Sequence, residues 1–241
     1  MPPLEAPAQN QGQRGVFVRL SGPCRARGGG GPGGGRRRGV DKSRAGALIC
    51  PAMALIYPFA FEPERALASL LYLAAKLPRP TLHSISKLLY FSDKRHLWKY
   101  GCLMFGDRYV AMENGPVPSA IYDMMKAVRD NACVQSVRGI PMEQLKQSLS
   151  VTEFHVTPLQ AANAMKLSES NWKCMDWAIE QYGNCTFDEL TDRSHDETWA
   201  ETAPNSVISV EAMTIGVKNR EALLEYLRDP YPGTAEELSA S

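Results

Sequence analysis

From residue 53 onward, apolar side chains mostly recur every three to four positions, the spacing of one face of an α-helix. Residues 64–76 carry such a stripe and are expected to form a first helix that ends before Pro78. A second, longer helix is expected between Thr81, a suitable N-cap, and Gly101, a suitable stop. Its stripe consists of Leu82, Ile85, Leu89, Ser92, His96 and Tyr100, and the basic residues Lys87, Lys94 and Arg95 are expected to point away from it.

Two segments break this helical spacing. Residues 105–112 contain aromatic and β-branched side chains bounded by glycine and Asn114-Gly115, which predicts a short strand. Residues 151–157 alternate again, and we expect Phe154 and Val156 to pair with that first strand. Between them, Pro116 and Pro118 fit the beginning of a helix that continues to about residue 129, because the first amides of a helix are unpaired anyway.

The last third of the chain is again helical. Ser168 precedes a helix that Gly183 closes, and Thr186 and Glu189 have the spacing of a capping box for a short helix. A final helix is expected over residues 219–228, before Pro230. The predicted fold class is α+β, mainly α, a helical domain with a small antiparallel β-hairpin or sheet.

Charge and glycine divide the chain. Residues 1–52 carry nine Lys or Arg and two Asp or Glu, for +7, whereas residues 53–241 carry eighteen and twenty-four, for −6. The first part also holds twelve of the nineteen glycines, so we expect a disordered Gly/Arg-rich leader over 1–52. Its arginines could bind nucleic acid electrostatically, or the natural start lies near Met53 and the leader belongs to an over-extended reading frame. The expected domain then spans 53–230, with a frayed tail over 231–241.

Export signals and disulfides are not expected. Residues 45–61 are uncharged, but Pro51 and Pro58 interrupt them and they are shorter than the roughly 20 apolar residues of a membrane span. The six cysteines are scattered without the paired spacing of a zinc ribbon. We therefore expect a cytoplasmic protein in a reducing compartment, with no membrane partner.

Four pieces of sequence, in order, resemble one known family. They are Lys87-Leu88-Leu89-Tyr90-Phe91-Ser92-Asp93, Tyr100-Gly101, Gly106-Asp107-Arg108-Tyr109-Val110-Ala111, and Gly115-Pro116-Val117-Pro118-Ser119 with Tyr122. Leu190, Ser194-His195 and Trp199 resemble a second landmark of the same family. Together they are similar to the Panacea domain, also called the SocA-like domain, of bacterial and phage toxin–antitoxin systems. The first 52 residues match nothing in that family, and the stretch 95–98 is more apolar than its pattern.

The resemblance implies an antitoxin that neutralises a toxin encoded nearby by binding it directly. Some relatives are implied to act as adaptors that deliver the toxin to a cytoplasmic protease. On this resemblance the signature or toxin-binding residues are Asp93, Tyr100, Asp107, Arg108, Tyr109, Gly115, Pro116, Val117, Pro118, His195 and Trp199. The alternative is a DNA-binding autoregulator of its own operon, for which Lys87, Lys94, Arg95 and Lys99 offer a modest basic helix.

Catalysis is not indicated by the residues. Asp93, Asp107, His195 and Glu197 could be assembled on paper into an acid–base or metal site, but they lack a zinc-ligand spacing. Structural roles are favoured: Asp93 tied to a neighbouring backbone or to Arg108, Asp107 paired with Arg108 or a turn amide, and His195 on Trp199 or a backbone carbonyl. We therefore expect no enzyme activity, no cofactor and no metal.

The proline-fixed segment 115–119 has two interpretations that stay open. A rigid loop beside a strand suits recognition, because little entropy is lost when it binds. The same segment could instead be a structural joint that sets the angle of the following helix.

Overall fold

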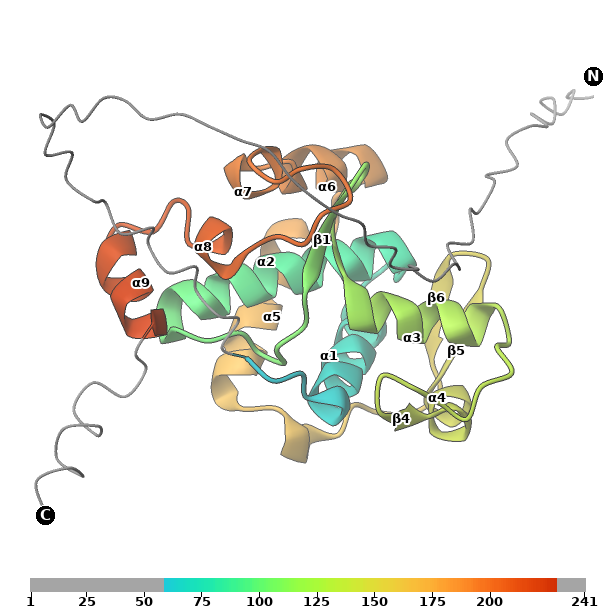
Figure 1. Ribbon diagram of the computed structural model, residues 1–241. Helices are drawn as coiled ribbons and strands as arrows, with labels where there is room; N and C mark the ends of the chain where they lie inside the picture. The colour runs from blue at the N-terminus through green and yellow to red at the C-terminus, as the bar shows by residue number, and fades with distance from the viewer. Residues whose placement is uncertain (1–58, 229–241) are drawn as a thin grey trace, which may run out of the picture. The chain divides into compact units, whose positions relative to one another are not determined.

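The computed structural model describes residues 59–228 (Figure 1). The expected leader over 1–52, the start at Met53 and the tail over 231–241 lie outside these residues. The helices are α1 (Pro63–Lys76), α2 (Leu82–Tyr100), α3 (Ser119–Arg129), α4 (Met142–Ser148), α5 (Glu169–Tyr182), α6 (Phe187–Ser194), α7 (Glu197–Ala200), α8 (Val210–Met213) and α9 (Arg220–Arg228), with a 3₁₀ turn η1 (Ala164–Lys166). The strands are β1 (Tyr109–Met112), β2 (Gly115–Pro118), β3 (Ser136–Val137), β4 (Ile140–Pro141), β5 (Leu149–Thr152) and β6 (His155–Pro158). The mainly helical α+β class is confirmed, and the strands of this part of the chain form two-stranded antiparallel hairpins.

Local capping chemistry sets the helix ends that the sequence predicted. Thr81 caps α2 with a capping box to Ser84, and Gly101 ends the helix in the left-handed conformation at φ +69°. Ser168 caps α5 and Thr186 caps α6 in the same way, each accepting a hydrogen bond from the backbone of the third helical residue. Such caps satisfy amides that a helix start would otherwise leave unpaired, and so they fix where the helices begin.

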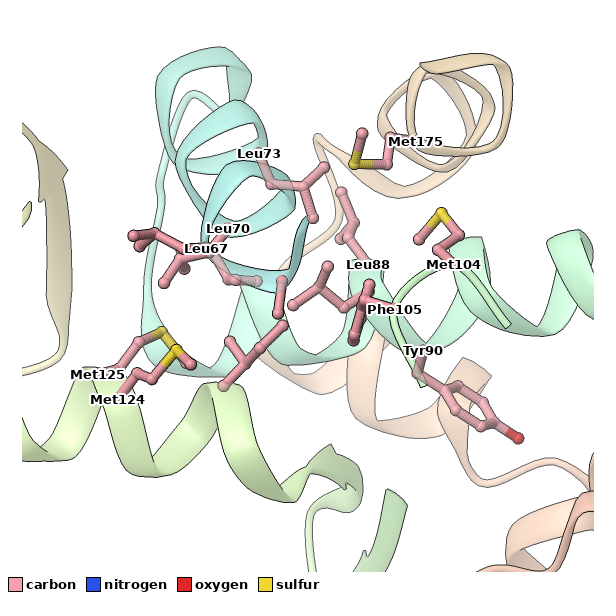
Figure 2. Packing of buried hydrophobic residues seen from close by; sticks show 14 of the residues in the cluster. Leu67, Leu70, Leu73, Leu88, Tyr90, Met104, Phe105, Met124, Met125 and Met175 are labelled. Atoms are coloured by element: carbon pink, nitrogen blue, oxygen red, sulfur yellow. The ribbon is translucent and has the colours of Figure 1, made fainter. Parts of the chain in front are cut away.

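The central element of the fold is α2, which contacts α1, α3, α5, α6 and β2. Figure 1 shows it running through the middle of the described part, with α6 on one side and α1 and α5 on the other. The core around it is built mostly from leucine and methionine (Figure 2). Leucines of α1 lie on the side of the cluster that faces Met124 and Met125 of α3, and the ring of Tyr90 on α2 lies at the opposite side of the view. Each buried side chain of this size contributes about 1.5–3 kcal/mol.

The prediction that the lysines of α2 point away from the core is wrong for two of them. Lys87 is 1% exposed and Lys94 is 8% exposed. The helix is enclosed by neighbours on several sides, so a position opposite the apolar stripe faces another element rather than water. Arg95, in contrast, is half-buried and lies over the ring of Trp177 at 4.1 Å.

The predicted strand exists, but its expected partner is wrong. Strand β1 pairs with β2, whose Gly115 and Val117 lie opposite Met112 and Val110. Residues 151–157 instead form a separate hairpin, β5–β6, in which Phe154 lies in the turn. Strands β1 and β2 are separated by a turn of only two residues. Closing this short loop costs less conformational entropy than pairing β1 with a segment about forty residues away.

Two prolines can lie in β2 because of their register. The amide of Ser119 donates to the carbonyl of Arg108 at 2.9 Å, so the hydrogen-bonded positions of the ladder alternate with Pro116 and Pro118. The nitrogens of both prolines therefore face away from β1, where no ladder bond is lost. Helix α3 begins one residue later than the prolines, at Ser119.

Strand β1 is also held on its other side, by residues 205–208. The carbonyl of Ser206 accepts from Ala111 at 2.9 Å, and the amide of Ile208 donates to the carbonyl of Tyr109 at 2.8 Å. The hairpin thus has backbone partners beyond its own ladder. No helix among residues 59–228 is both long enough and apolar enough to cross a membrane.

Candidate functional site

Asp93 lies in the interior of the molecule, on the side of α2 that faces the start of β1. Its carboxylate is 0% exposed and accepts hydrogen bonds from the backbone amide of Met104 at 2.5 Å and from the hydroxyl of Tyr109 at 2.9 Å. Burial raises the pKa of Asp93 to about 7, while these two donors oppose the rise. The predicted tie to a neighbouring backbone is confirmed, and Tyr109 takes the place expected for an arginine.

Asp107 lies just before β1 and connects this part of the chain to the start of α3. Its carboxylate accepts from the backbone amides of Arg108 at 2.7 Å, Ala120 at 3.0 Å and Ile121 at 3.1 Å. The last two belong to the first turn of α3, so Asp107 caps that helix from a distant position in the chain. Burial raises the pKa of Asp107, and the three amides partly offset that rise. The expected binding of a backbone amide is present, but two of the amides belong to the first turn of α3 rather than to a turn.

The turn of the β1–β2 hairpin is bound by His195 and Trp199, two residues of the second family landmark. The His195 ring stacks on Trp199 with ring centroids 3.7 Å apart. Nε2 of His195 lies 3.1 Å from the carbonyl oxygen of Glu113, and the indole Nε1–H of Trp199 donates to the carbonyl of Met112 at 2.9 Å. Both roles expected for His195 are therefore present at once.

Gly115 and Pro116 bring the hairpin against α2 and α6. Gly115 has φ +90°, and a Cβ there would lie 2.2 Å from Oγ of Ser194, so only glycine fits. The carbonyl of Pro116 accepts a hydrogen bond from Nζ of Lys87 at 3.0 Å. Burial lowers the pKa of Lys87 to about 7. This contact could not be predicted from the sequence, because a lysine on a helix is usually solvated.

A network of hydrogen bonds and one ion pair joins α2 to residues 196–198, next to His195 and Trp199. Nζ of Lys94 lies 2.6 Å from Oδ2 of Asp196 and 2.7 Å from Oγ1 of Thr198, and the hydroxyl of Tyr90 donates to the same carboxylate. Asp196 also caps α7 by accepting from the amide of Trp199 at 3.1 Å. Sequence reasoning missed this network, although Tyr90 lies inside the pieces that carry the resemblance and Asp196 directly follows His195.

The remaining expected site residues differ in exposure. Tyr100 is 42% exposed at the end of α2, and the side chain of Arg108 is exposed, whereas Val117 is half-buried. The prolines of β2 are buried. The structure thus assembles most of the expected residues around one hairpin and leaves Tyr100 at the far end of α2.

Three of the four residues considered for an acid–base site have structural partners instead. Asp93 and Asp107 are engaged by backbone amides and a tyrosine hydroxyl, and His195 by a carbonyl. Within residues 59–228, no three His, Cys, Asp or Glu side chains are placed to hold a metal ion. The basic helix needed for DNA recognition is also depleted, because Lys87 and Lys94 are buried.

The buried prolines of β2 are expected to stabilise the fold. We expect replacing Pro116 and Pro118 together with alanine to lower the free energy of unfolding by about 2 kcal/mol per site, through lost buried carbons and a more flexible unfolded chain. Urea unfolding followed by circular dichroism measures the change, with exposed Pro204→Ala as the control. Unchanged stability together with lost binding of a partner protein would instead favour the recognition role.

The family comparison agrees with this geometry. Residues 85–200 match the family model described as the antitoxin SocA-like, Panacea domain. This part of the chain is similar to the SocA-like Panacea domain. The match begins in α2 and ends with α7, so it includes Asp93, the β1–β2 hairpin and both landmark rings. We found no significant match among curated proteins or among solved structures.

Proposed function

We propose that this protein neutralises a toxin, encoded by a neighbouring gene, by binding it directly. The observation that carries the proposal is the match of residues 85–200 to the Panacea antitoxin family. We place both partners in the cytoplasm.

The interior of the domain supports a binding role. The signature carboxylates of Asp93 and Asp107 hold backbone amides, and the landmark rings of His195 and Trp199 hold the turn of the hairpin. Such contacts fix the backbone of a scaffold before any partner arrives. A surface that is rigid in advance loses little conformational entropy on binding, which favours affinity.

Charge supports a basic partner. The net charge of residues 53–241 is −6, and an acidic body attracts a basic protein over distances of about 10 Å at moderate salt. We expect the association rate with the toxin to fall as salt increases from 0.05 to about 0.5 M, because long-range attraction is screened. Stopped-flow or surface-plasmon measurements at several salt concentrations test this.

A co-expression experiment tests the function itself. Each reading frame next to this gene is induced alone and together with this protein, and growth is followed. We expect one frame to arrest growth, growth to be restored by co-expression, and the two proteins to co-purify as a stoichiometric complex. If no toxic neighbour is neutralised, or if growth is restored without any complex, direct neutralisation is contradicted.

The same strain separates simple binding from delivery to a protease. If the protein also acts as an adaptor, the half-life of the toxin after translation is stopped falls when this protein is present. A longer or unchanged half-life with full growth rescue shows that binding alone suffices.

A further inference from the structure

A hollow of about 280 Å³ opens between the first turns of α2, the β1–β2 hairpin, the β5–β6 turn and the start of α6. Its lining includes three apolar side chains that are well exposed to solvent: Met112 at 39%, Phe154 at 67% and Phe187 at 52%. Single exposed apolar residues are ordinary, but several gathered around one hollow are typical of an interaction site.

The segments that carry the two phenylalanines are tied to α2. The carbonyl of Phe154 accepts a hydrogen bond from the amide of Leu82 at 2.9 Å, which ties the β5–β6 turn to the start of α2. The ring of Phe187 stacks on His83 at 4.0 Å, and Nε2 of His83 lies 3.0 Å from Oγ1 of Thr191. The backbone of Phe154 and the ring of Phe187 are therefore each anchored to the start of α2.

A lysine without a counter-ion also lines this hollow. Lys87 is 1% exposed, and Nζ donates to the carbonyl of Pro116. Within residues 59–228, no carboxylate lies within 4.0 Å of that nitrogen. An ammonium group has three donors, and burying a charge without an anionic partner costs several kcal/mol. The scaffold therefore leaves capacity at Lys87 for an acceptor from outside.

The other titratable groups of the lining do not supply that acceptor. Burial, and then the nearby Lys87, lower the pKa of His83 to about 4, so the imidazole is neutral at pH 7. Glu113 is exposed to solvent at the hairpin turn. The hollow thus combines an apolar pair of rings with the amino group of Lys87, which has no carboxylate partner among residues 59–228.

We propose that this hollow is the docking site for a segment of the toxin that inserts one aromatic or branched apolar side chain beside Phe154 and Phe187 and brings a carboxylate to Nζ of Lys87. The inference rests on the proposed function, whose partner it makes more specific. A toxin that is basic overall is compatible with it, because long-range steering depends on net charge and this contact on one local carboxylate.

A small probe tests the hollow without the toxin. N-acetyl-phenylalanine carries an apolar ring and a carboxylate, and N-acetyl-phenylalanine amide is its matched control without the charge. We expect millimolar N-acetyl-phenylalanine to shift the backbone amide resonances of residues 82–87, 114–117, 154 and 187 in ¹⁵N-labelled protein, the amide to bind at least 5-fold more weakly, and Lys87→Met to remove this preference. No shifts at these residues would overturn the inference.

The toxin complex provides the second test. We expect Phe154→Ala, Phe187→Ala and Lys87→Met each to raise the dissociation constant at least 10-fold in calorimetric titrations, whereas Met165→Ala, a 91% exposed residue outside the hollow, changes it less than 2-fold. Thermal unfolding confirms that each variant folds. If Lys87→Met fails to fold, the dissociation constant of Phe154→Ala is used instead, because Phe154 is exposed and its replacement leaves the core intact.

The outcomes separate the two proposals. Undiminished toxin binding by all three hollow variants overturns the docking site while direct neutralisation stands. Probe binding without any neutralised neighbour supports the hollow as a site for acidic apolar segments and contradicts the toxin role.

Discussion

Replacing Asp93 with alanine should lower the free energy of unfolding by about 3–5 kcal/mol, because it leaves two buried donors unpaired and opens a small cavity. The donors are the backbone amide of Met104 and the hydroxyl of Tyr109, which belong to the segment that leads from α2 into β1. Without their shared acceptor, this segment loses its tie to the central helix. Urea unfolding at pH 7 measures the loss.

Asp93→Asn is the matched variant. An amide has the shape of a protonated carboxyl group, accepts from the Met104 amide through its oxygen, and donates to the Tyr109 oxygen through its nitrogen. We therefore expect asparagine to retain most of the stability that alanine loses. Asp192→Ala, at an exposed position of α6, should stay close to the wild type. Equal losses for alanine and asparagine would show that the two hydrogen bonds are not what Asp93 contributes.

The pH dependence of the same pair follows from the burial of Asp93. The folded pKa is raised to about 7, whereas an unfolded aspartate titrates near 3.9, so between these values the folded state holds the extra proton. The associated stability is fully present below about pH 4 and is lost as pH rises through 7. We expect wild-type stability, measured relative to Asp93→Asn, to fall by up to about 4 kcal/mol between pH 4 and pH 8. A difference that does not change with pH would contradict the raised pKa.

Helix ends were predictable from the sequence because their signals are local. Thr81 and Gly101 act through hydrogen bonds and backbone angles within a few residues of the helix that they bound, and the structure places them as expected. Asp93 was predictable in part for a related reason. A carboxylate at the edge of an apolar stripe requires donors, although the sequence does not say that one of them is Tyr109.

Pairings between distant segments were not predictable in this way. The partner of β1 was assigned to the wrong segment, since residues 151–157 have suitable alternation but belong to the separate β5–β6 hairpin. The roles of Lys87 and Lys94 were missed because a helical pattern shows which face is apolar but not how many neighbours surround the helix. Helix α4 and the two-residue strands β3 and β4 carry too few residues to produce a readable period.

The second large effect on the free energy of unfolding is expected at the ion pair between Lys94 of α2 and Asp196. Removing the carboxylate with Asp196→Ala leaves the Lys94 ammonium in the interior with Thr198 as its remaining hydrogen-bond acceptor, and it leaves the Tyr90 hydroxyl without its acceptor. Breaking a buried pair from one side costs about 3–5 kcal/mol, and the partial exposure of Asp196 places our expectation near the lower end. Lys94→Met should cost about 1 kcal/mol, because Asp196 keeps the Tyr90 hydroxyl and the Trp199 amide as donors.

The double variant decides whether the charge itself is responsible. Once Lys94 is methionine, no buried cation is left behind by Asp196→Ala, so the second substitution should cost at least 1 kcal/mol less than it does in the wild type. Both singles, the double variant and the wild type are compared by urea unfolding in the same buffer. Additive losses would mean that Asp196 stabilises the fold through its cap on α7 and its bond to Tyr90 alone, and that Lys94 is held in place by its packing and by Thr198. A loss for the double variant that is smaller than that for Asp196→Ala alone would show that the unpaired lysine is the main cost, as expected for a charge that the fold encloses on nearly every side.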